Sequence, residues 1–182
     1  MSGSMKPIKA SVGFTRGAGF VSGAIQYIDG GKFNHVYYRF DFADGGALIY
    51  ESHIRGGVQI TPYEHLLSAK QHGKVLNIQE VDLNLSPVEV QNLWNFCLPY
   101  HHKAYDARRI IGYYMFIRFA RRAGKKFLKL HKAGKMTCNE FVIQVGKDAG
   151  LRGFRKLDFS FTIEPLVRFF TGKTSDMIIP GK

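Results

Sequence analysis

The stretch "KFNHVYYRFDFADGGALIYESHIRGGVQI", residues 32–60, decides the fold expected for this chain of 182 residues. Its first part, residues 32–42, is dense in aromatic and β-branched side chains, which favour a strand. The segment "ADGG" at 43–46 is typical of a hairpin turn. Residues 47–60 then return as a strand that is broken at Gly56-Gly57. The stretch therefore predicts an antiparallel β-meander.

The flanking segments extend this meander into an α+β fold. Residues 7–15 alternate loosely and predict a first strand, and "VLNIQEVDL" at 75–83 predicts a further one. Between them, residues 16–31 are rich in small side chains and predict a short helix that is closed by Gly30-Gly31. The sequence shows no internal repeat, so we expect one α+β domain.

Two more helices are predicted from their first residues. The segment "TPYEHLLSAKQHGK" gives one of them, with Thr61 as its cap and Pro62 at its first position. The segment "SPVEVQNLWNFCLPYH" gives the other, with Ser86 as its cap and Pro87 at its first position. Cys97 lies on the apolar face of this second helix, where a cysteine acts as a small hydrophobic residue.

Composition excludes several classes of protein. Hydrophobic residues make up 45% of the chain and aromatic residues 14%, values typical of a folded protein. No apolar run approaches the roughly 20 residues that span a bilayer, and "MSGSMKPIKA" lacks the apolar core of a signal peptide. Two cysteines cannot build a disulfide framework, which favours an intracellular setting. We interpret residues 1–5 as an added leader and 6–182 as a single domain.

Positive charge is concentrated in one third of the chain. The net charge is +12, and residues 101–160 hold 15 Lys and Arg against 4 Asp and Glu. Within them, "IIGYYMFIRFARRAGKKFLKLHKAG" predicts a basic amphipathic helix that suits an anionic polymer or a membrane surface. A peripheral helix with a solvated face is the alternative. The cations that share one face of this helix are Arg118, Arg121, Arg122, Lys125, Lys126 and Lys129.

A cysteine stands at the start of another predicted helix, "KMTCNEFVIQVGKDAG", residues 135–150. Thr137 and Glu140 have the spacing of a capping box, which makes Cys138 the first helical residue. The N-terminus of a helix carries about half a positive charge, so it would stabilise a thiolate and could also bind an oxyanion. A cysteine that merely begins a helix is the alternative.

A thiolate nucleophile needs a base, and one of the seven histidines lies in a suitable place. His35 is in the aromatic strand, whereas Glu51 and His53 share one face of the next strand because strand side chains alternate. A hairpin pairing of these strands would bring either residue near His35. A purely structural histidine at position 35 is the alternative.

Three short segments in this order resemble the circularly permuted papain-like enzymes: "FNHVYYRFD" (33–41), "ALIYESHIRGGVQ" (47–59) and "TCNEFV" (137–142). That superfamily includes amidases and peptidases related to the NlpC-type cell-wall hydrolases, and the lecithin retinol acyltransferase group. Its members have an "sHVGIY"-like strand and a late "CSEFV"-like helix start, so that His precedes Cys, the reverse of ordinary papain. The resemblance spans about residues 10–150.

The resemblance implies a permuted papain-like fold, with an antiparallel sheet packed against helices and the nucleophile at a helix N-terminus. It makes Cys138 the nucleophile, His35 the general base and Glu51 the group that orients the imidazole, with His53 as the alternative third member. These roles agree with those drawn from the residues themselves, in which thiolate attack on a carbonyl forms an acyl-enzyme. A bacterial or phage origin is also implied.

The sequence departs from the family pattern in two places. Tyr37 stands where the family usually has a small glycine, so it could crowd or shape the pocket. The basic segment before Cys138 is longer than the family pattern leads us to expect. The extra length could form a substrate lid or a surface-binding element. The stretch "AYDARRIIG" resembles a "YD" motif of the family, but it assigns no role to Tyr105 or Asp106.

We therefore expect a thiol hydrolase that cleaves an amide bond in a peptide or cell-wall-type substrate. One alternative is a lipid acyltransferase or acyl hydrolase at a membrane surface, and another is a non-catalytic basic binding module. No nucleic-acid motif is present, so nucleic acid is not an expected partner. The adjacent His101 and His102 lack the spacing of metal ligands, so we expect neither a metal nor another cofactor.

Overall fold

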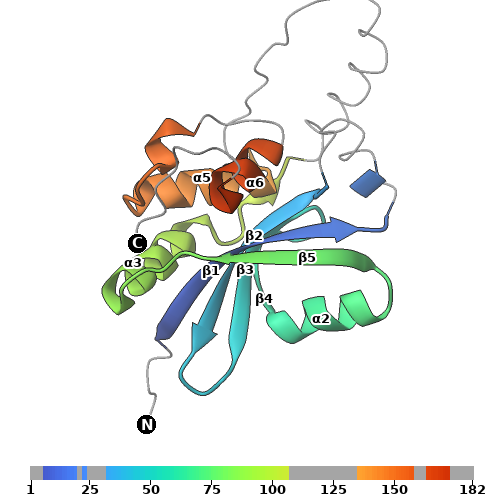
Figure 1. The fold of residues 1–182 in the computed structure, drawn as a ribbon, viewed down its shortest axis with the longest axis horizontal. Coiled ribbons are helices and arrows are strands. Elements are labelled where there is room, and N and C mark those ends of the chain that lie inside the picture. The colour runs from blue at the N-terminus through green and yellow to red at the C-terminus, as the bar shows by residue number, and fades with distance from the viewer. Residues whose placement is uncertain (1–5, 20–21, 24–31, 107–134, 158–162, 173–182) are drawn as a thin grey trace, which may run out of the picture.

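The computed structural model describes residues 6–19, 22–23, 32–106, 135–157 and 163–172. Five of its strands form one antiparallel sheet in the order β4-β3-β2-β1-β5 (Figure 1). The predicted α+β class and the meander are thereby confirmed. The five strands are β1 (Pro7–Gly17), β2 (His35–Phe42), β3 (Ala47–His53), β4 (Gly57–Pro62) and β5 (Val75–Asp82).

Helices and one small second sheet complete the described part of the chain. The second sheet pairs two short parallel strands, one of which directly precedes the helix that begins at Cys138. The α-helices are α2 (Tyr63–Gln71), α3 (Pro87–Cys97), α5 (Cys138–Asp148) and α6 (Glu164–Thr171). The short strands are β6 (Ala104–Tyr105) and β7 (Lys135–Met136), and the 3₁₀ helices are η1 (Leu98–Tyr100) and η2 (Phe154–Lys156).

One face of the five-stranded sheet forms the hydrophobic core with α3, α5 and α6. Along β2, alternate residues such as Tyr38 and Phe40 are fully buried in this core, as expected for a strand with one buried face. The hydroxyl of Tyr38 donates a hydrogen bond to the carbonyl oxygen of Val142 in α5 at 2.7 Å. The ring of Phe141 stacks on Tyr50 of β3, with centroids 5.7 Å apart. These contacts fix α5 against the centre of the sheet.

The other face of the sheet is polar and lies next to α2. Glu80 of β5 accepts hydrogen bonds from the hydroxyls of Tyr37 at 2.8 Å and Tyr63 at 3.2 Å. Glu80 also forms an ion pair with Arg39 of β2 at 2.7 Å. The guanidinium of Arg39 lies 4.0 Å from the ring centroid of Tyr63, the first residue of α2. This network holds the start of α2 against β2 and β5.

Tyr37, the departure from the family pattern, is accommodated by a glycine on the neighbouring strand. It is paired with Gly13 of β1, and a Cβ atom on Gly13 would lie 2.0 Å from Cζ of the Tyr37 ring. Only 1% of Tyr37 is exposed. The ring therefore packs across β1 toward Glu80, where its hydroxyl is bound.

Two predicted helix starts differ in outcome. The cap at Ser86 is confirmed, because Glu89 accepts hydrogen bonds from both the backbone N–H and the hydroxyl of Ser86. The cap at Thr61 is wrong: Thr61 belongs to β4, and Pro62 is the N-cap of α2. Thr61 instead donates its hydroxyl to Glu51 at 3.3 Å, so its side chain serves the sheet rather than the helix.

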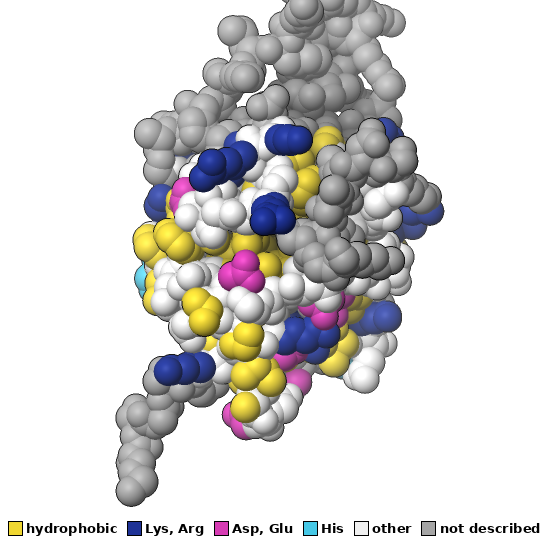
Figure 2. Space-filling view, turned by 60° about the vertical axis from the view of Figure 1, so that its left-hand side comes forward, with side chains coloured by type: hydrophobic (Ala, Val, Ile, Leu, Met, Phe, Trp, Pro, Cys, Tyr) yellow, Lys and Arg dark blue, Asp and Glu magenta, His cyan; other side chains and the backbone are white. Residues whose placement is uncertain are grey.

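Several sequence predictions concern residues outside the described ranges. They include the leader at 1–5, most of the predicted helix at 16–31, and the whole of the basic helix with its six cations. On the face in Figure 2, the described Lys and Arg side chains are scattered among neutral and apolar ones rather than joined in one patch. Within the described residues, no helix has both the length and the apolar character needed to cross a membrane.

The contact between Tyr37 and Gly13 gives a stability prediction. Gly13→Ala should destabilise the protein by about 1–3 kcal/mol, because the new methyl group overpacks the Tyr37 ring. In a Tyr37→Ala background the same change should cost clearly less, since the ring that it meets is gone. Urea unfolding of the four proteins of this cycle measures the coupling. An equal cost of Gly13→Ala in both backgrounds would contradict the contact.

Candidate active site

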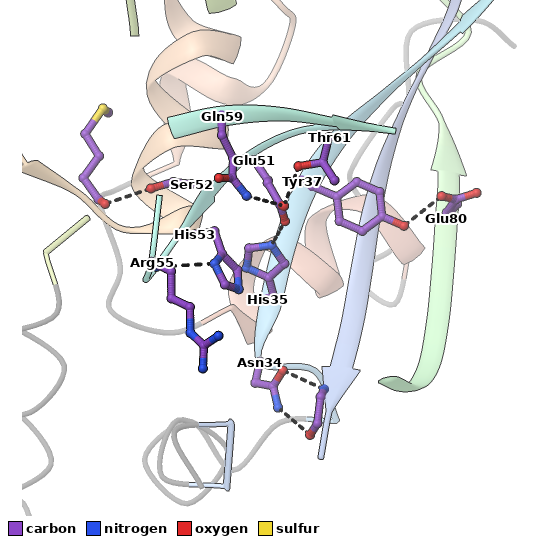
Figure 3. A network of polar contacts seen from close by, with 12 residues as sticks. Asn34, His35, Tyr37, Glu51, Ser52, His53, Arg55, Gln59, Thr61 and Glu80 are labelled. Carbon is purple, nitrogen blue, oxygen red and sulfur yellow. Dashed lines mark hydrogen bonds and ion pairs between the residues drawn. The ribbon is translucent and has the colours of Figure 1, made fainter. Parts of the chain in front are cut away.

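The candidate site lies at the end of the sheet where β2 begins and β3 ends. His35 is the first residue of β2, and the register pairs Tyr37 with Glu51, so that Glu51 is a diagonal neighbour of His35. Oε2 of Glu51 lies 2.7 Å from Nε2 of His35 (Figure 3). The structure thus brings together two of the three residues that the sequence singled out.

The second carboxylate oxygen of Glu51 is bound by the next strand. Gln59 donates its side-chain amide to Oε1 at 3.2 Å, and Thr61 donates its hydroxyl to the same atom at 3.3 Å. Gln59 is paired with Glu51 across β3 and β4, and Thr61 lies two residues further along on the same face. Sequence reasoning missed both residues, although alternation within "VQITP" would have placed them on one face. They fix the carboxylate from the side opposite His35.

Cys138 is the first residue of α5, as predicted. Oε2 of Glu140 accepts hydrogen bonds from the backbone N–H and the hydroxyl of Thr137, each at 3.0 Å. The strand before the helix is tied to β3, because Ser52 donates its hydroxyl to the carbonyl oxygen of Met136 at 3.0 Å. Cys138 is therefore held at the end of the sheet that carries His35.

Cys138 also interacts with His35. Burial of His35 opposes its protonation, but hydrogen bonds and charge interactions with Cys138 and Glu51 outweigh this and raise the pKa of His35 to about 10. For Glu51, burial likewise favours the neutral form. Its hydrogen bonds to His35 and Gln59, with the positive charge on His35, nevertheless lower the pKa of Glu51 to about 2. The site therefore favours an imidazolium paired with the Glu51 carboxylate.

Tyr105 is a further residue of the site. The parallel pairing of β6 and β7 sets it beside Met136, and its side chain forms a hydrogen bond with Cys138. Burial, followed by the charge of Cys138 and this hydrogen bond, raises the pKa of Tyr105 well above its ordinary value, so its hydroxyl keeps the proton that it donates. The "YD" resemblance was the one sequence signal for this position.

The strand that carries Tyr105 is positioned by the edge of the sheet. The backbone N–H of Val58 donates to the carbonyl oxygen of Lys103 at 2.8 Å, and His102 returns a hydrogen bond from its N–H to Val58. Gly57 precedes this contact with a φ of +67°, and a Cβ there would lie 2.2 Å from the Lys103 oxygen. A glycine is therefore required for β4 to approach the start of β6.

The two cysteines have different surroundings. Cys97 is fully buried in α3, and burial raises the pKa of its thiol well above the ordinary value. Cys138 is 4% exposed and interacts with both His35 and Tyr105. The apolar environment predicted for Cys97 is confirmed.

His53, the alternative third member, forms no hydrogen bond with His35 in the described part of the structure. Its Nδ1 atom instead accepts the backbone N–H of Arg55 at 3.4 Å. The rings of His53 and His35 lie edge to face, with centroids 6.2 Å apart. Of the two residues that the sequence left open, Glu51 is the one that forms a hydrogen bond with His35 in the described structure.

A cleft of about 370 Å³ opens beside His35 and Glu51. It extends between the ends of β1, β3 and β5 and the helix α2, and much of its wall is apolar. Tyr37 is not part of this wall. The apolar residues that line the cleft include Ile49, Ile54, Leu66, Ala69 and Val75. The polar residues that line it include Asn34, Ser52, His53, Thr61, His65, Lys74 and Tyr105. A substrate could therefore reach His35 along an apolar surface that carries a few polar groups.

Metal ligands do not gather in the described residues. There, no group of three or more His, Cys, Asp or Glu side chains is placed to hold a metal ion. His101 and His102 have ring centroids 3.9 Å apart, but no third ligand of this kind joins them within the described ranges.

Comparison with known proteins yields a likeness of fold. No family model and no curated protein matches the sequence. Among solved structures, the chain is similar to the metalloprotein yiiX of Escherichia coli O157:H7, DUF1105, with a TM-score of 0.54 and 18% sequence identity. The match covers 94% of this chain and 86% of that one. At this identity the likeness concerns the fold alone.

The pair formed by His35 and Glu51 predicts a pH window of stability. Because the pKa of Glu51 is lowered from 4.5 to about 2, its contribution is complete above pH 4.5 and is lost as the pH falls through 2. Because the pKa of His35 is raised from 6.5 to about 10, its contribution is complete below pH 6.5 and is lost as the pH rises through 10.

Glu51→Gln should therefore reduce the unfolding free energy most between pH 4.5 and 6.5, by on the order of 3 kcal/mol. The difference from the wild type should shrink on both sides of this window. Urea unfolding of both proteins at a series of pH values measures it. A difference that does not change with pH would contradict the ion pair.

Proposed function

We propose that this protein is a thiol hydrolase that cleaves an amide bond through a covalent acyl-enzyme, with the fold of the permuted papain-like enzymes. The observation that carries the proposal is the set of contacts of His35, which binds Glu51 at 2.7 Å and also forms a hydrogen bond with Cys138. A nucleophile, a base and a group that orients the base are the three parts that such chemistry requires.

The two ring nitrogens of His35 have separate tasks in this proposal. Nε2 is bound to Glu51, which leaves Nδ1 as the nitrogen that exchanges a proton with Cys138. The carboxylate fixes the ring orientation and stabilises the imidazolium. The thiolate at the start of α5 is stabilised by that imidazolium, by the Tyr105 hydroxyl and by the helix dipole.

The reaction then proceeds in two steps. In the first, the Cys138 sulfur attacks the substrate carbonyl carbon, the C–N bond breaks, and His35 gives its proton to the leaving amine. In the second, His35 takes a proton from water, hydroxide attacks the thioester, and the C–S bond breaks so that the acid departs and the pair of thiolate and imidazolium is restored. The free backbone N–H groups in the first turn of α5 can stabilise the oxyanion of each tetrahedral intermediate.

The apolar wall of the cleft favours a second candidate, in which the acyl group comes from a lipid. Ile49, Ile54, Leu66, Ala69 and Val75 would suit a hydrocarbon chain as well as a peptide side chain. The nucleophile and the base are the same in both candidates. The binding module without catalysis rests on the basic helix, which lies outside the described residues. It would give no role to the contacts of His35 with Cys138 and Glu51.

Thiol labelling tests the activated nucleophile. At pH 7, iodoacetamide should alkylate Cys138 quickly and the buried Cys97 slowly, as read by mass spectrometry of peptides. In His35→Ala, labelling of Cys138 should slow about 10-fold or more, because an unassisted thiol is only a few per cent ionised at this pH. His72→Ala is the matched control, since His72 caps the far end of α2. Equal, sluggish labelling of both cysteines would refute the proposal.

Acyl-enzyme formation separates the two candidate substrates. Intact mass spectrometry should detect an adduct on Cys138 with peptidoglycan fragments, and the adduct should be absent from Cys138→Ala. Glu51→Gln should retain the adduct but form it more slowly, because the imidazole loses its orienting anion while the nucleophile remains. An adduct formed with phospholipid or lipid esters and not with the peptide fragments would favour the acyl hydrolase instead.

A further inference from the structure

His53 is a cleft residue that the proposed reaction does not use. It is the last residue of β3, two positions beyond Glu51 on the same face. Both oxygens of Glu51 are bound by other side chains, His35 on one and Gln59 and Thr61 on the other. Figure 3 shows the ring of His53 beside that of His35. A second imidazole therefore borders the reacting pair without belonging to it.

The hydrogen bond from Arg55 fixes the tautomer of His53. Because Nδ1 accepts the backbone N–H of Arg55, a neutral ring must carry its hydrogen on Nε2. Burial lowers the pKa of His53; the charge of Glu51 opposes this, whereas those of His35 and Arg55 lower it further. At neutral pH the side chain is thus an uncharged donor that points a single N–H away from Arg55.

Several polar side chains of the cleft wall already have hydrogen-bond partners within the protein. Asn34 is engaged with the backbone of Gly17 and Ser22, and Ser52 donates its hydroxyl to the Met136 carbonyl oxygen. Thr61 donates to Glu51. By contrast, Nε2 of His53 has no hydrogen-bond partner within the described residues, and its ring lines the cleft. A half-buried donor of this kind gains a hydrogen bond when a ligand supplies the acceptor.

The position of His53 assigns it to one side of the substrate. Its ring lies edge to face with that of His35, with centroids 6.2 Å apart, and both residues line the cleft. Cys138, which also interacts with His35, is not among the residues that line the cleft. The cleft therefore leads past His35 and His53, away from the thiol. In the proposed reaction His35 protonates the leaving amine, so the cleft beyond His35 receives the segment that departs with that amine.

We propose that the Nε2–H of His53 binds a carbonyl oxygen in the leaving group of the substrate. The assignment rests on the proposed function and narrows its substrate class. The bond that is cleaved would join the acyl group to an amino acid or peptide, whose own carbonyl meets His53. A simple amine without such a carbonyl would be a poorer leaving group for this cleft.

Two thioesters that share the acetyl group test this assignment: S-acetyl thioglycolamide, whose leaving group has a carbonyl, and S-ethyl thioacetate, whose leaving group has none. In each case the Cys138 sulfur displaces a thiolate, which leaves with the His35 proton and can be measured. For each variant, the value of kcat/KM for the first ester is divided by the value for the second. Comparing this ratio between variants removes the difference in intrinsic reactivity between the two esters. Hydrolysis of the common acetyl-enzyme follows departure of the leaving group and is an internal control.

We expect His53→Ala to lower this ratio about 5- to 10-fold, the size of one hydrogen bond. Hydrolysis of the acetyl-enzyme and iodoacetamide labelling of Cys138 should be unchanged. His53→Gln should restore much of the ratio, because its amide N–H can replace the Nε2–H. His72→Ala should behave as the wild type.

Three results would overturn the assignment. A ratio that is unchanged in His53→Ala means that His53 does not bind the leaving group. An equal loss with both esters, accompanied by slower labelling, means that His53 supports His35 instead. In both cases the proposed function stands if His35→Ala still slows labelling. Failure of both esters to acetylate Cys138 would refute the proposed function itself, and this assignment with it.

Discussion

The hydrogen bond between His35 and Glu51 depends on the register of one hairpin. The turn at residues 43–46 sets the pairing of β2 with β3, and with it the position of Glu51 beside His35. A slip of one residue would turn Glu51 to the core face, because strand side chains alternate. The next strand shares the constraint, since Gln59 and Thr61 bind the same carboxylate. Three strands thus converge on one carboxylate, and the sheet and the candidate site cannot be varied independently.

Local patterns were sufficient for much of this arrangement. The aromatic run and the "ADGG" turn predicted β2 and β3, and the spacing of Thr137 and Glu140 predicted where α5 begins. The choice between Glu51 and His53 could not be made locally, because both lie on the same face of β3. It depends on which side chain reaches His35 diagonally across the pairing. Thr61 was misassigned for a related reason: a threonine before proline is typical of a helix cap, and only β4 pairing reveals its role.

Contacts between distant parts of the chain could not be predicted from the sequence. The bond from Ser52 to Met136 joins β3 to the strand before Cys138, and no periodicity relates residues so far apart. Tyr105 reaches the thiol through a parallel pair of two-residue strands, too short to leave a pattern. The fit of Tyr37 over Gly13 is likewise a property of two strands together. For such residues, the sequence gives the chemical groups of the side chains but not their positions in the fold.

In the proposed reaction, the proton affinity of His35 changes at the moment that catalysis requires. Before acylation, interactions with Cys138 and Glu51 raise the pKa of His35 to about 10, which keeps the imidazolium ready to protonate a leaving amine. Formation of the thioester removes the interaction of His35 with a thiolate. Glu51 alone then offsets the cost of burying a charged imidazolium ring. The pKa of His35 must then fall, which favours the neutral base that deacylation by water needs. A carboxylate partner that is itself held by Gln59 and Thr61 keeps the ring in place through both states. His35 therefore serves first as acid and then as base.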